Sequence, residues 1–157
     1  MSGDGSPMRE AVAEAAAGLA AGDGGPFGAV VTRDGVVIGR GHNQVVGLND
    51  PSAHAEVQAI RAACRALGTF DLSGCEIWAT CEPCPMCFAA IHWARLGRVH
   101  YGAARADAAG IGFDDAAIYE VLAGSRAPAF AVTAGVEADA CLDLMRRWRD
   151  DDRRVPY

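Results

Sequence analysis

The residues best suited to chemistry lie in two short stretches of this 157-residue sequence, Pro-Cys-Pro-Met-Cys at 83–87 and His-Ala-Glu at 54–56. Cys84 and Cys87 are three residues apart, so in the first turn of a helix their side chains lie on one face. There the free N–H groups and the positive end of the helix dipole favour thiolate over thiol. One imidazole, from His54, and two thiolates can bind a tetrahedral zinc ion and leave its fourth position open, which is typical of catalytic zinc.

The acidic residue next to the histidine supplies the remaining part of such a site. His54 and Glu56 are two residues apart, so inside a helix they would point to nearly opposite sides. At the N-terminus of a helix, both side chains can point to the same site. Asn-Asp-Pro-Ser at 49–52, before a run of periodically spaced apolar residues, predicts that a helix begins there. The pattern H-x-E followed by P-C-x-x-C is the signature of zinc deaminases. We therefore expect a hydrolytic site with one Zn²⁺ per chain, held by His54, Cys84 and Cys87, and Glu56 as proton shuttle.

Two other interpretations of the cysteines have to be weighed. Cys-Pro-Met-Cys after a strand and opening a helix is also typical of a redox motif, and a non-enzymatic redox or metal-binding module is the alternative from another functional class. With Cys81, the spacing also matches the start of a ferredoxin-type cluster, but no fourth cysteine follows Cys87 closely. Neither interpretation accounts for His54 and Glu56. A fourth thiolate would close the site, so we expect Cys81 to be buried and unligated.

Length and composition limit the class of protein. A chain of this length predicts a single domain over 1–157, with a frayed polar leader over its first seven residues. The net charge of −6 argues against binding of long nucleic acid. Six cysteines without a signal-like leader predict a reducing, cytoplasmic location. No apolar run approaches the length of a membrane span, so we expect no membrane partner.

Strands alternate with helices after one hairpin, whose turn is Asp34-Gly35. We expect helices over 8–21, 53–67, 84–95, 114–123 and 138–149, and strands over 27–32, 36–41, 75–80, 98–101 and 130–133. This order predicts an α/β fold: a three-layer α/β/α sandwich with a central mixed sheet of about five strands. Ligands that enter at two helix N-termini beside strand ends would lie in the crevice where such sheets bind small molecules.

The two motif stretches resemble the cytidine deaminase superfamily and, within it, most closely the bacterial guanine deaminases. The likeness is carried by the stretches 24–30, 49–56, 81–87, 90–95 and 112–115 and by the terminal Tyr157. It implies a cytidine deaminase-like fold and hydrolysis of guanine to xanthine and ammonia, with zinc hydroxide as nucleophile. It also implies a homodimer in which the segment of about 135–157 is exchanged, so that Tyr157 closes the partner's pocket. The substrate contacts that it implies are Phe27, Asn43, Ala55 (through its backbone), Trp93, Asp115 and Tyr157.

Several of these residues also have ordinary structural roles. Asp114 and Asp115 precede a predicted helix and suit its N-cap, so the sequence leaves open which of them meets a substrate. Phe27 and Trp93 are by default core aromatics, and Asn43 is by default a turn former. The substrate also stays open, because pocket contacts decide among guanine, guanosine, cytosine, cytidine and aminotriazines. A tRNA adenosine deaminase shares the zinc motifs, but the acidic balance and the aromatic terminus speak against it.

Overall fold

The computed structural model describes residues 6–157, so the first five residues of the predicted leader lie outside it. Its helices are α1 Pro7–Ala21, α2 Val45–Leu48, α3 Ala55–Leu67, α4 Pro85–Trp93, α5 Arg105–Gly110, α6 Ala116–Leu122 and α7 Ala138–Arg149. Its strands are β1 Gly28–Arg33, β2 Val36–His42, β3 Cys75–Cys81 and β4 Arg98–Ala103. In this part of the chain no helix is long and apolar enough to cross a membrane.

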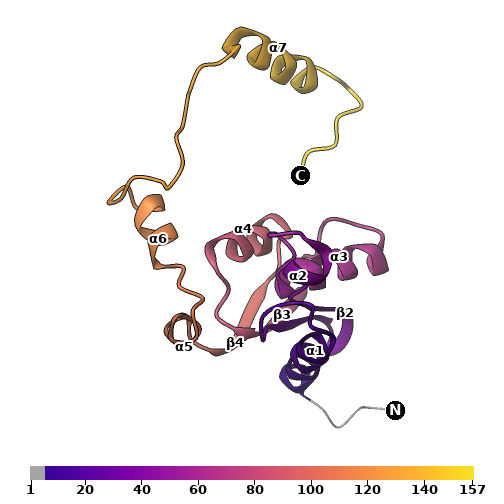
Figure 1. The fold of residues 1–157 in the computed structure, drawn as a ribbon. Coiled ribbons are helices and arrows are strands. Elements are labelled where there is room, and N and C mark those ends of the chain that lie inside the picture. Colours follow the sequence, from indigo (N-terminus) through magenta and orange to yellow (C-terminus); the bar gives the residue numbers. More distant parts are fainter. Residues whose placement is uncertain (1–5) are drawn as a thin grey trace.

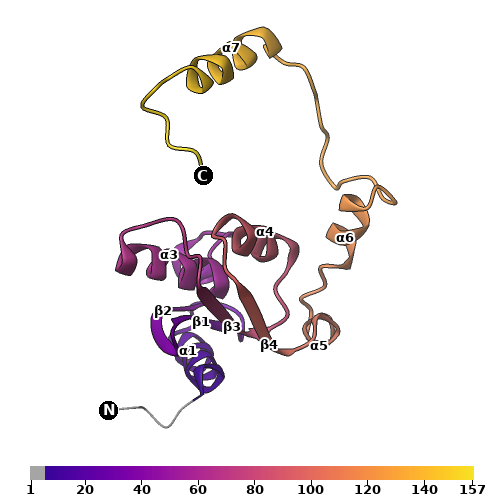
Figure 2. The same cartoon turned by 180° about the vertical axis from the view of Figure 1, so that it is seen from behind.

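The strands form one mixed sheet in the order β2-β1-β3-β4. β1 pairs antiparallel with both β2 and β3, whereas β3 and β4 run parallel. Helix α1 covers one face, and α3 and α4 cover the other (Figures 1 and 2). The predicted three-layer α/β fold with a mixed sheet is confirmed. The sheet has four strands in residues 6–157, one fewer than expected.

The main core lies between the sheet and the layer formed by α3 and α4. Alternate residues of β3, from Cys75 through Ile77 to Cys81, are buried on this face. Ile77 packs there with alanines of α3 and with Ile91 of α4. A Cβ on Gly41 of β2 would lie 2.5 Å from the backbone nitrogen of Ala59, so only glycine lets α3 approach the sheet this closely. This close contact fixes the position of α3, which begins directly after His54, against the sheet.

The missing strand is the one predicted over 130–133. Phe130 and Val132 are exposed, and the segment has no strand pairing in the described part of the chain. A strand forms only where a neighbour satisfies its backbone N–H and C=O groups, and here the segment runs away from β4 (Figure 1). The short helices α2 and α5 are not among the predicted elements, because a helix of four or six residues leaves too little periodic pattern to recognise.

The C-terminal segment projects from the layered body. No residue of α7 is buried, although Leu142, Leu144, Met145 and Trp148 are large and apolar. The helix lies well separated from the sheet, and the last residues turn back towards α4 (Figure 2). An amphipathic helix with an uncovered apolar face normally packs against another surface.

Candidate zinc and substrate site

Two helix entrances face each other above the sheet and carry the motif residues. His54 is the N-cap residue of α3, and Glu56 lies in the first turn of that helix. Cys84 is the N-cap residue of α4, Pro85 takes the first helical position, and Cys87 follows in the first turn. Both residue pairs therefore lie at helix starts, as their spacing in the sequence predicts. Both helices direct the positive ends of their dipoles towards the same point.

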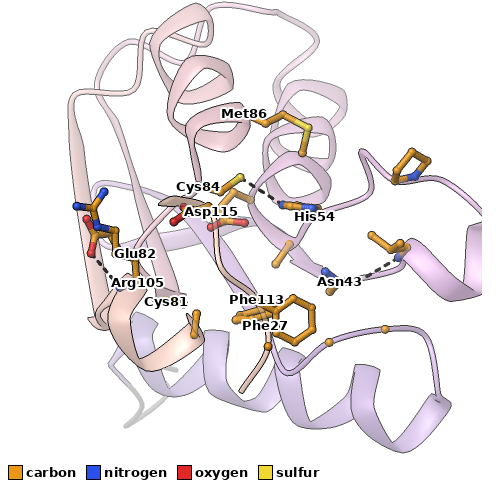
Figure 3. A pocket seen from close by; sticks show the side chains of 18 of the residues that line it. Phe27, Asn43, His54, Cys81, Glu82, Cys84, Met86, Arg105, Phe113 and Asp115 are labelled. Carbon is orange, nitrogen blue, oxygen red and sulfur yellow. Dashed lines mark hydrogen bonds between the residues drawn. The ribbon is translucent and has the colours of Figure 1, made fainter. Parts of the chain in front are cut away.

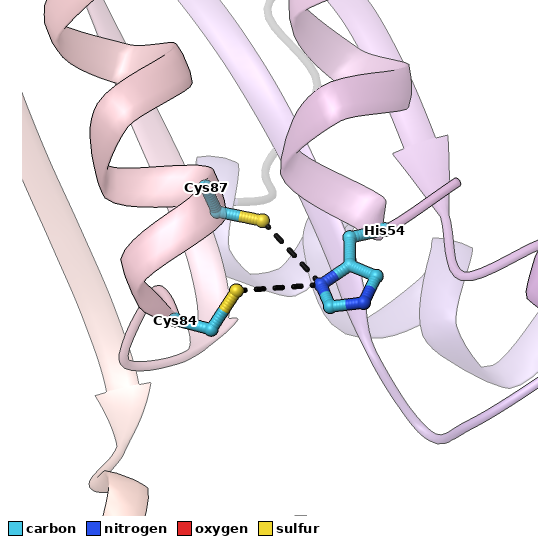
Figure 4. Close-up of side chains that lie close together, drawn as sticks. All are labelled: His54, Cys84 and Cys87. Carbon is cyan, nitrogen blue, oxygen red and sulfur yellow. Dashed lines mark hydrogen bonds between the residues drawn. The ribbon is translucent and has the colours of Figure 1, made fainter. Parts of the chain in front are cut away.

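His54, Cys84 and Cys87 meet at that point (Figure 4). The Nδ1 atom of His54 lies 3.5 Å from the Sγ atom of Cys84 and 3.5 Å from that of Cys87. All three donor atoms lie within 4.8 Å of one another. Tetrahedral zinc with ordinary Zn–N and Zn–S bonds places a nitrogen and a sulfur ligand about 3.6 Å apart. The donor types and their separations therefore fit a zinc ion.

The three donor groups lie close enough to shift one another's pKa values. Interaction with the neighbouring Cys87 thiol lowers the pKa of Cys84 to about 4, and the hydrogen bond with His54 also lowers it. Interaction with Cys84 raises the pKa of Cys87, as does burial. The hydrogen bond with Cys84 raises the pKa of His54. Zinc binds cysteine as the thiolate, so binding of the ion here would release the thiol protons that remain.

Glu56 lies directly beside the three donors. Its side chain is buried, and its Oε2 atom accepts a hydrogen bond from the thiol of Cys87 at 3.4 Å. Burial raises the pKa of Glu56 above its usual range. When Cys87 gives up its proton to bind a cation, Glu56 loses this donor and its oxygen becomes available to another. A buried carboxyl group this close to the candidate donors is in position for proton transfer at the open side of the cluster.

A cavity of about 820 Å³ opens in front of this cluster (Figure 3). His54, Cys84 and Glu56 form part of its wall, so the open side of the three donors faces the cavity. Of the residues implied as substrate contacts, the wall also contains Phe27, Asn43, Ala55 and Asp115. These four stay predicted contacts, but the fold brings them to the same cavity as the candidate zinc ligands.

Asn43 and Phe27 are held by neighbours that fix how they face the cavity. Asn43 is buried, its backbone N–H donates to the carbonyl of Phe27, and its Oδ1 accepts from the N–H of Val45 at 3.2 Å. Because the Oδ1 atom accepts this bond, the amide NH₂ group of Asn43 remains available to donate a hydrogen bond to a ligand. The ring of Phe27 meets that of Phe113 edge to face, with centroids 4.9 Å apart. The pair forms an apolar wall on which a flat heterocycle can lie.

The two adjacent aspartates have different surroundings. The Oδ1 atom of Asp114 accepts a hydrogen bond from the backbone N–H of Ala116 at 2.9 Å, which is a local turn interaction. Asp115 is the N-cap residue of α6 by backbone position, but its side chain makes no capping hydrogen bond. It is half-buried, and this burial raises the pKa of Asp115. Both aspartates line the cavity, and the Asp115 side chain is the one that makes no local turn or capping hydrogen bond.

Trp93 and Tyr157 do not join this group in the chain as described. Trp93 lies at the end of α4 and is 63% exposed, and its ring centroid is 6.2 Å from that of Tyr157. Tyr157 also approaches Phe70, at 6.2 Å. Both residues lie outside the cavity wall. Their roles as substrate contacts stay predictions, and that of Tyr157 concerns the partner's pocket.

Several wall residues were not predicted from the sequence. Phe113 belongs to the Gly-Phe-Asp-Asp stretch, in which only an aspartate was predicted to contact the substrate. Glu82 lies inside the cysteine motif. Arg105 also lines the cavity, and no sequence pattern marks it. Cys81 lines the cavity as well, but its thiol donates to the carbonyl of Ala104 at 3.8 Å and it is not among the three donors. Burial raises the pKa of Cys81 and keeps it a thiol.

The layered fold and the three converging donors define a class of protein, the zinc-dependent hydrolytic deaminases. Residues 1–103 match the family model described as the cytidine and deoxycytidylate deaminase zinc-binding region. The chain belongs to this family, and the resemblance inferred from the two motifs is confirmed.

The proteins to which the chain is similar include guanine deaminase and tRNA-specific adenosine deaminase. Guanine deaminase of Bacillus subtilis (strain 168) is 53% identical over 113 residues, which cover 72% of each chain. The X-ray structure of guanine deaminase from Bacillus subtilis superposes with a TM-score of 0.86 at 44% identity and covers 96% of each chain. A tRNA-specific adenosine deaminase of Agrobacterium fabrum is also 53% identical, but over 78 residues, which are 50% of this chain and 51% of that one. The chain is thus a homologue of guanine deaminase in a family of hydrolytic deaminases.

Proposed function

We propose that this enzyme hydrolyses free guanine to xanthine and ammonia. The observation that carries the proposal is the placement of the Asp115 carboxylate, which makes no capping hydrogen bond, in the same cavity wall as Asn43, Glu56 and the candidate donors His54 and Cys84. The whole-chain likeness to guanine deaminase of Bacillus subtilis supports the choice of base.

His54, Cys84 and Cys87 would hold a zinc ion, and the ion would supply a Lewis acid that lowers the pKa of a water molecule. Two thiolates and a neutral imidazole cancel its formal charge, so the residues around it must assist in removing the proton. Glu56 is the buried carboxylate in position to do so. It accepts a proton from the attacking water and delivers it to the ring nitrogen beside the amino-bearing carbon. The second water proton follows to the leaving amino group, and the products are xanthine and ammonia.

The other wall residues hold the base in place for this attack. The Asp115 carboxylate accepts hydrogen bonds from the amidine-like N–H edge of guanine, and the NH₂ group of Asn43 donates to an acceptor of the ring. The free backbone N–H of Ala55, in the first turn of α3, offers a further donor. The ring of Phe27 lies against the flat face of the base. Carboxylate recognition favours a substrate with adjacent ring and amino N–H groups, which guanine has and cytosine lacks.

Ammonia release from the zinc-loaded protein is the test, with guanine, guanosine, adenine, cytosine and cytidine in parallel. Release from guanine alone is expected. Release from a nucleoside or a pyrimidine would keep the zinc chemistry but overturn the assignment of the base. Inactivity on all five with zinc bound would contradict the proposal and make RNA-borne adenosine and aminotriazines the next substrates. A reversible Cys84–Cys87 disulfide without metal would instead indicate the redox module.

We also propose that the single domain acts as a homodimer in which the segment of about 135–157 is exchanged. The uncovered apolar face of α7, with Leu142 and Trp148, supports this, since such a face is normally packed in the working assembly. Tyr157 would then close the partner's pocket. The six free cysteines support a reducing location such as the cytoplasm.

Mixing two inactive chains tests the exchange. One chain carries Glu56→Gln and keeps its tail, and the other has an intact core but ends before Tyr157. If the tail acts on the partner, a mixed dimer holds one complete site, and random pairing restores about a quarter of the wild-type rate. If the tail acts within its own chain, both cores of every mixed dimer stay incomplete, and no activity returns.

A further inference from the structure

The segment that carries Asp115 is connected to the layered body by few packed residues. No residue of α6 is buried, and Asp115 stands at its start. Phe113 holds one end through its edge contact with Phe27. The rest of the helix needs another anchor, because an exposed helix of seven residues is too short to be stable alone. Tyr119, one turn into α6, provides the second contact.

The guanidinium of Arg105 lies over the ring of Tyr119, with its Cζ atom 4.5 Å from the ring centroid. This is the geometry of a cation–π interaction. Arg105 is the first residue of α5, and its backbone N–H donates to the Oε2 atom of Glu82 at 3.0 Å. Glu82 follows β3 directly, and its own backbone N–H donates to the carbonyl of Ala103 at 2.8 Å. Figure 3 shows Glu82 and Arg105 side by side at the cavity.

These contacts form a continuous connection across the site. Glu82 lies two residues before the candidate ligand Cys84, so it is fixed relative to the metal donors. Arg105 links Glu82 to α6 through Tyr119, and α6 begins at Asp115. The positive charge of Arg105 also attracts the Asp115 carboxylate. We propose that Glu82, Arg105 and Tyr119 are positioning residues that set where Asp115 lies relative to the zinc ligands, and so determine affinity for guanine.

This inference rests on the proposed function, because it takes Asp115 as the residue that binds the base. It predicts an effect on KM for guanine and little on kcat, since the Glu56 chemistry stays intact. An exposed cation–π contact corresponds to a loss of about two- to fivefold in affinity. Arg105→Ala and Tyr119→Leu should each raise KM by this factor. Tyr119→Phe keeps the ring and should behave like wild type.

Two further measurements separate positioning from a general loss of structure. In an Asp115→Asn background, Arg105→Ala should cause no additional rise in KM, because the residue to be positioned is gone. Amide hydrogen exchange over residues 116–122 should be faster in Arg105→Ala and Tyr119→Leu but unchanged in Tyr119→Phe. Zinc content should equal that of wild type in all variants.

Three results would overturn the proposal: an unchanged KM in Tyr119→Leu, a full additional rise in KM from Arg105→Ala in the Asp115→Asn background, or unchanged exchange over 116–122. If the wild-type protein does not turn over guanine, the proposed function fails by itself. The exchange measurement then still decides whether the contacts hold α6, because it requires no substrate.

Discussion

Replacing Glu56 by glutamine tests the central chemical role with almost no change of shape. The side chain is buried beside Cys87, and its oxygen accepts the thiol hydrogen bond at 3.4 Å. Glutamine keeps an oxygen that can accept this bond, but it cannot take a proton from water. The three candidate metal donors are unaltered. The substitution therefore removes proton transfer and leaves the site assembled.

The expected loss follows from what a positioned general base contributes. Such a group accelerates proton transfer about 10²- to 10⁴-fold, so kcat should fall by this factor. At 1.36 kcal/mol for each tenfold change, this corresponds to roughly 3–5 kcal/mol of transition-state stabilisation. Stability should not fall in parallel. Burial raises the pKa of Glu56, which means that its ionised form is disfavoured in the fold, and a neutral amide avoids that cost.

The assay is steady-state ammonia release from guanine, combined with zinc content and thermal unfolding of the same samples. Glu10→Gln is a matched control, because it makes the same chemical change at a surface carboxylate that pairs with Arg40. The control should retain wild-type kcat. A zinc-loaded Glu56→Gln protein with a kcat near that of wild type would refute the role of Glu56. Loss of zinc together with activity would show that the residue supports the metal site instead.

Three further results are expected. Removal of zinc by a chelator should abolish ammonia release and lower the melting temperature, and added zinc should restore both, because a metal that binds only the folded chain stabilises it. Activity retained in the metal-free protein would contradict the zinc assignment. Gly41→Ala should destabilise the fold by about 1–3 kcal/mol in chemical denaturation and reduce activity, since its Cβ would lie 2.5 Å from the Ala59 nitrogen and displace α3. Gly110→Ala is the control, because its Cβ meets nothing within 4 Å and its φ is not positive, and equal effects of the two would argue against the close approach. The hydrogen bond from Ser73 and then the interaction with Arg95 lower the pKa of Asp71 from its ordinary value of 3.8. The ionised Asp71 side chain therefore stabilises the fold at neutral pH, and this stabilisation is lost as the pH falls from 3.8 towards the lowered pKa. Asp71→Asn should therefore lower the melting temperature at pH 7 but much less near pH 3, and a pH-independent difference would exclude this linkage.

The sequence alone determined the parts of the site that depend on spacing within one short segment. Cys84 and Cys87 share a helix face because they are three residues apart, and His54 and Glu56 converge because a helix begins between them. Patterns of this kind are local and act before any long-range packing. The same holds for the hairpin of β1 and β2 and for the mixed α/β order.

Only the tertiary structure decided which distant residues meet. Phe27, directly before β1, and Phe113, just before α6, meet edge to face at the cavity only because the fold brings these two segments together. Arg105 and Tyr119 meet because α5 folds between β4 and α6, and no periodic pattern encodes that contact. The strand expected over 130–133 requires backbone partners as well as β-forming residues, and those partners are absent where this part of the chain lies. Local spacing therefore marks the candidate metal donors within each segment. The meeting of His54 with the two cysteines and the wall of the cavity depend on contacts between segments that only the fold brings together.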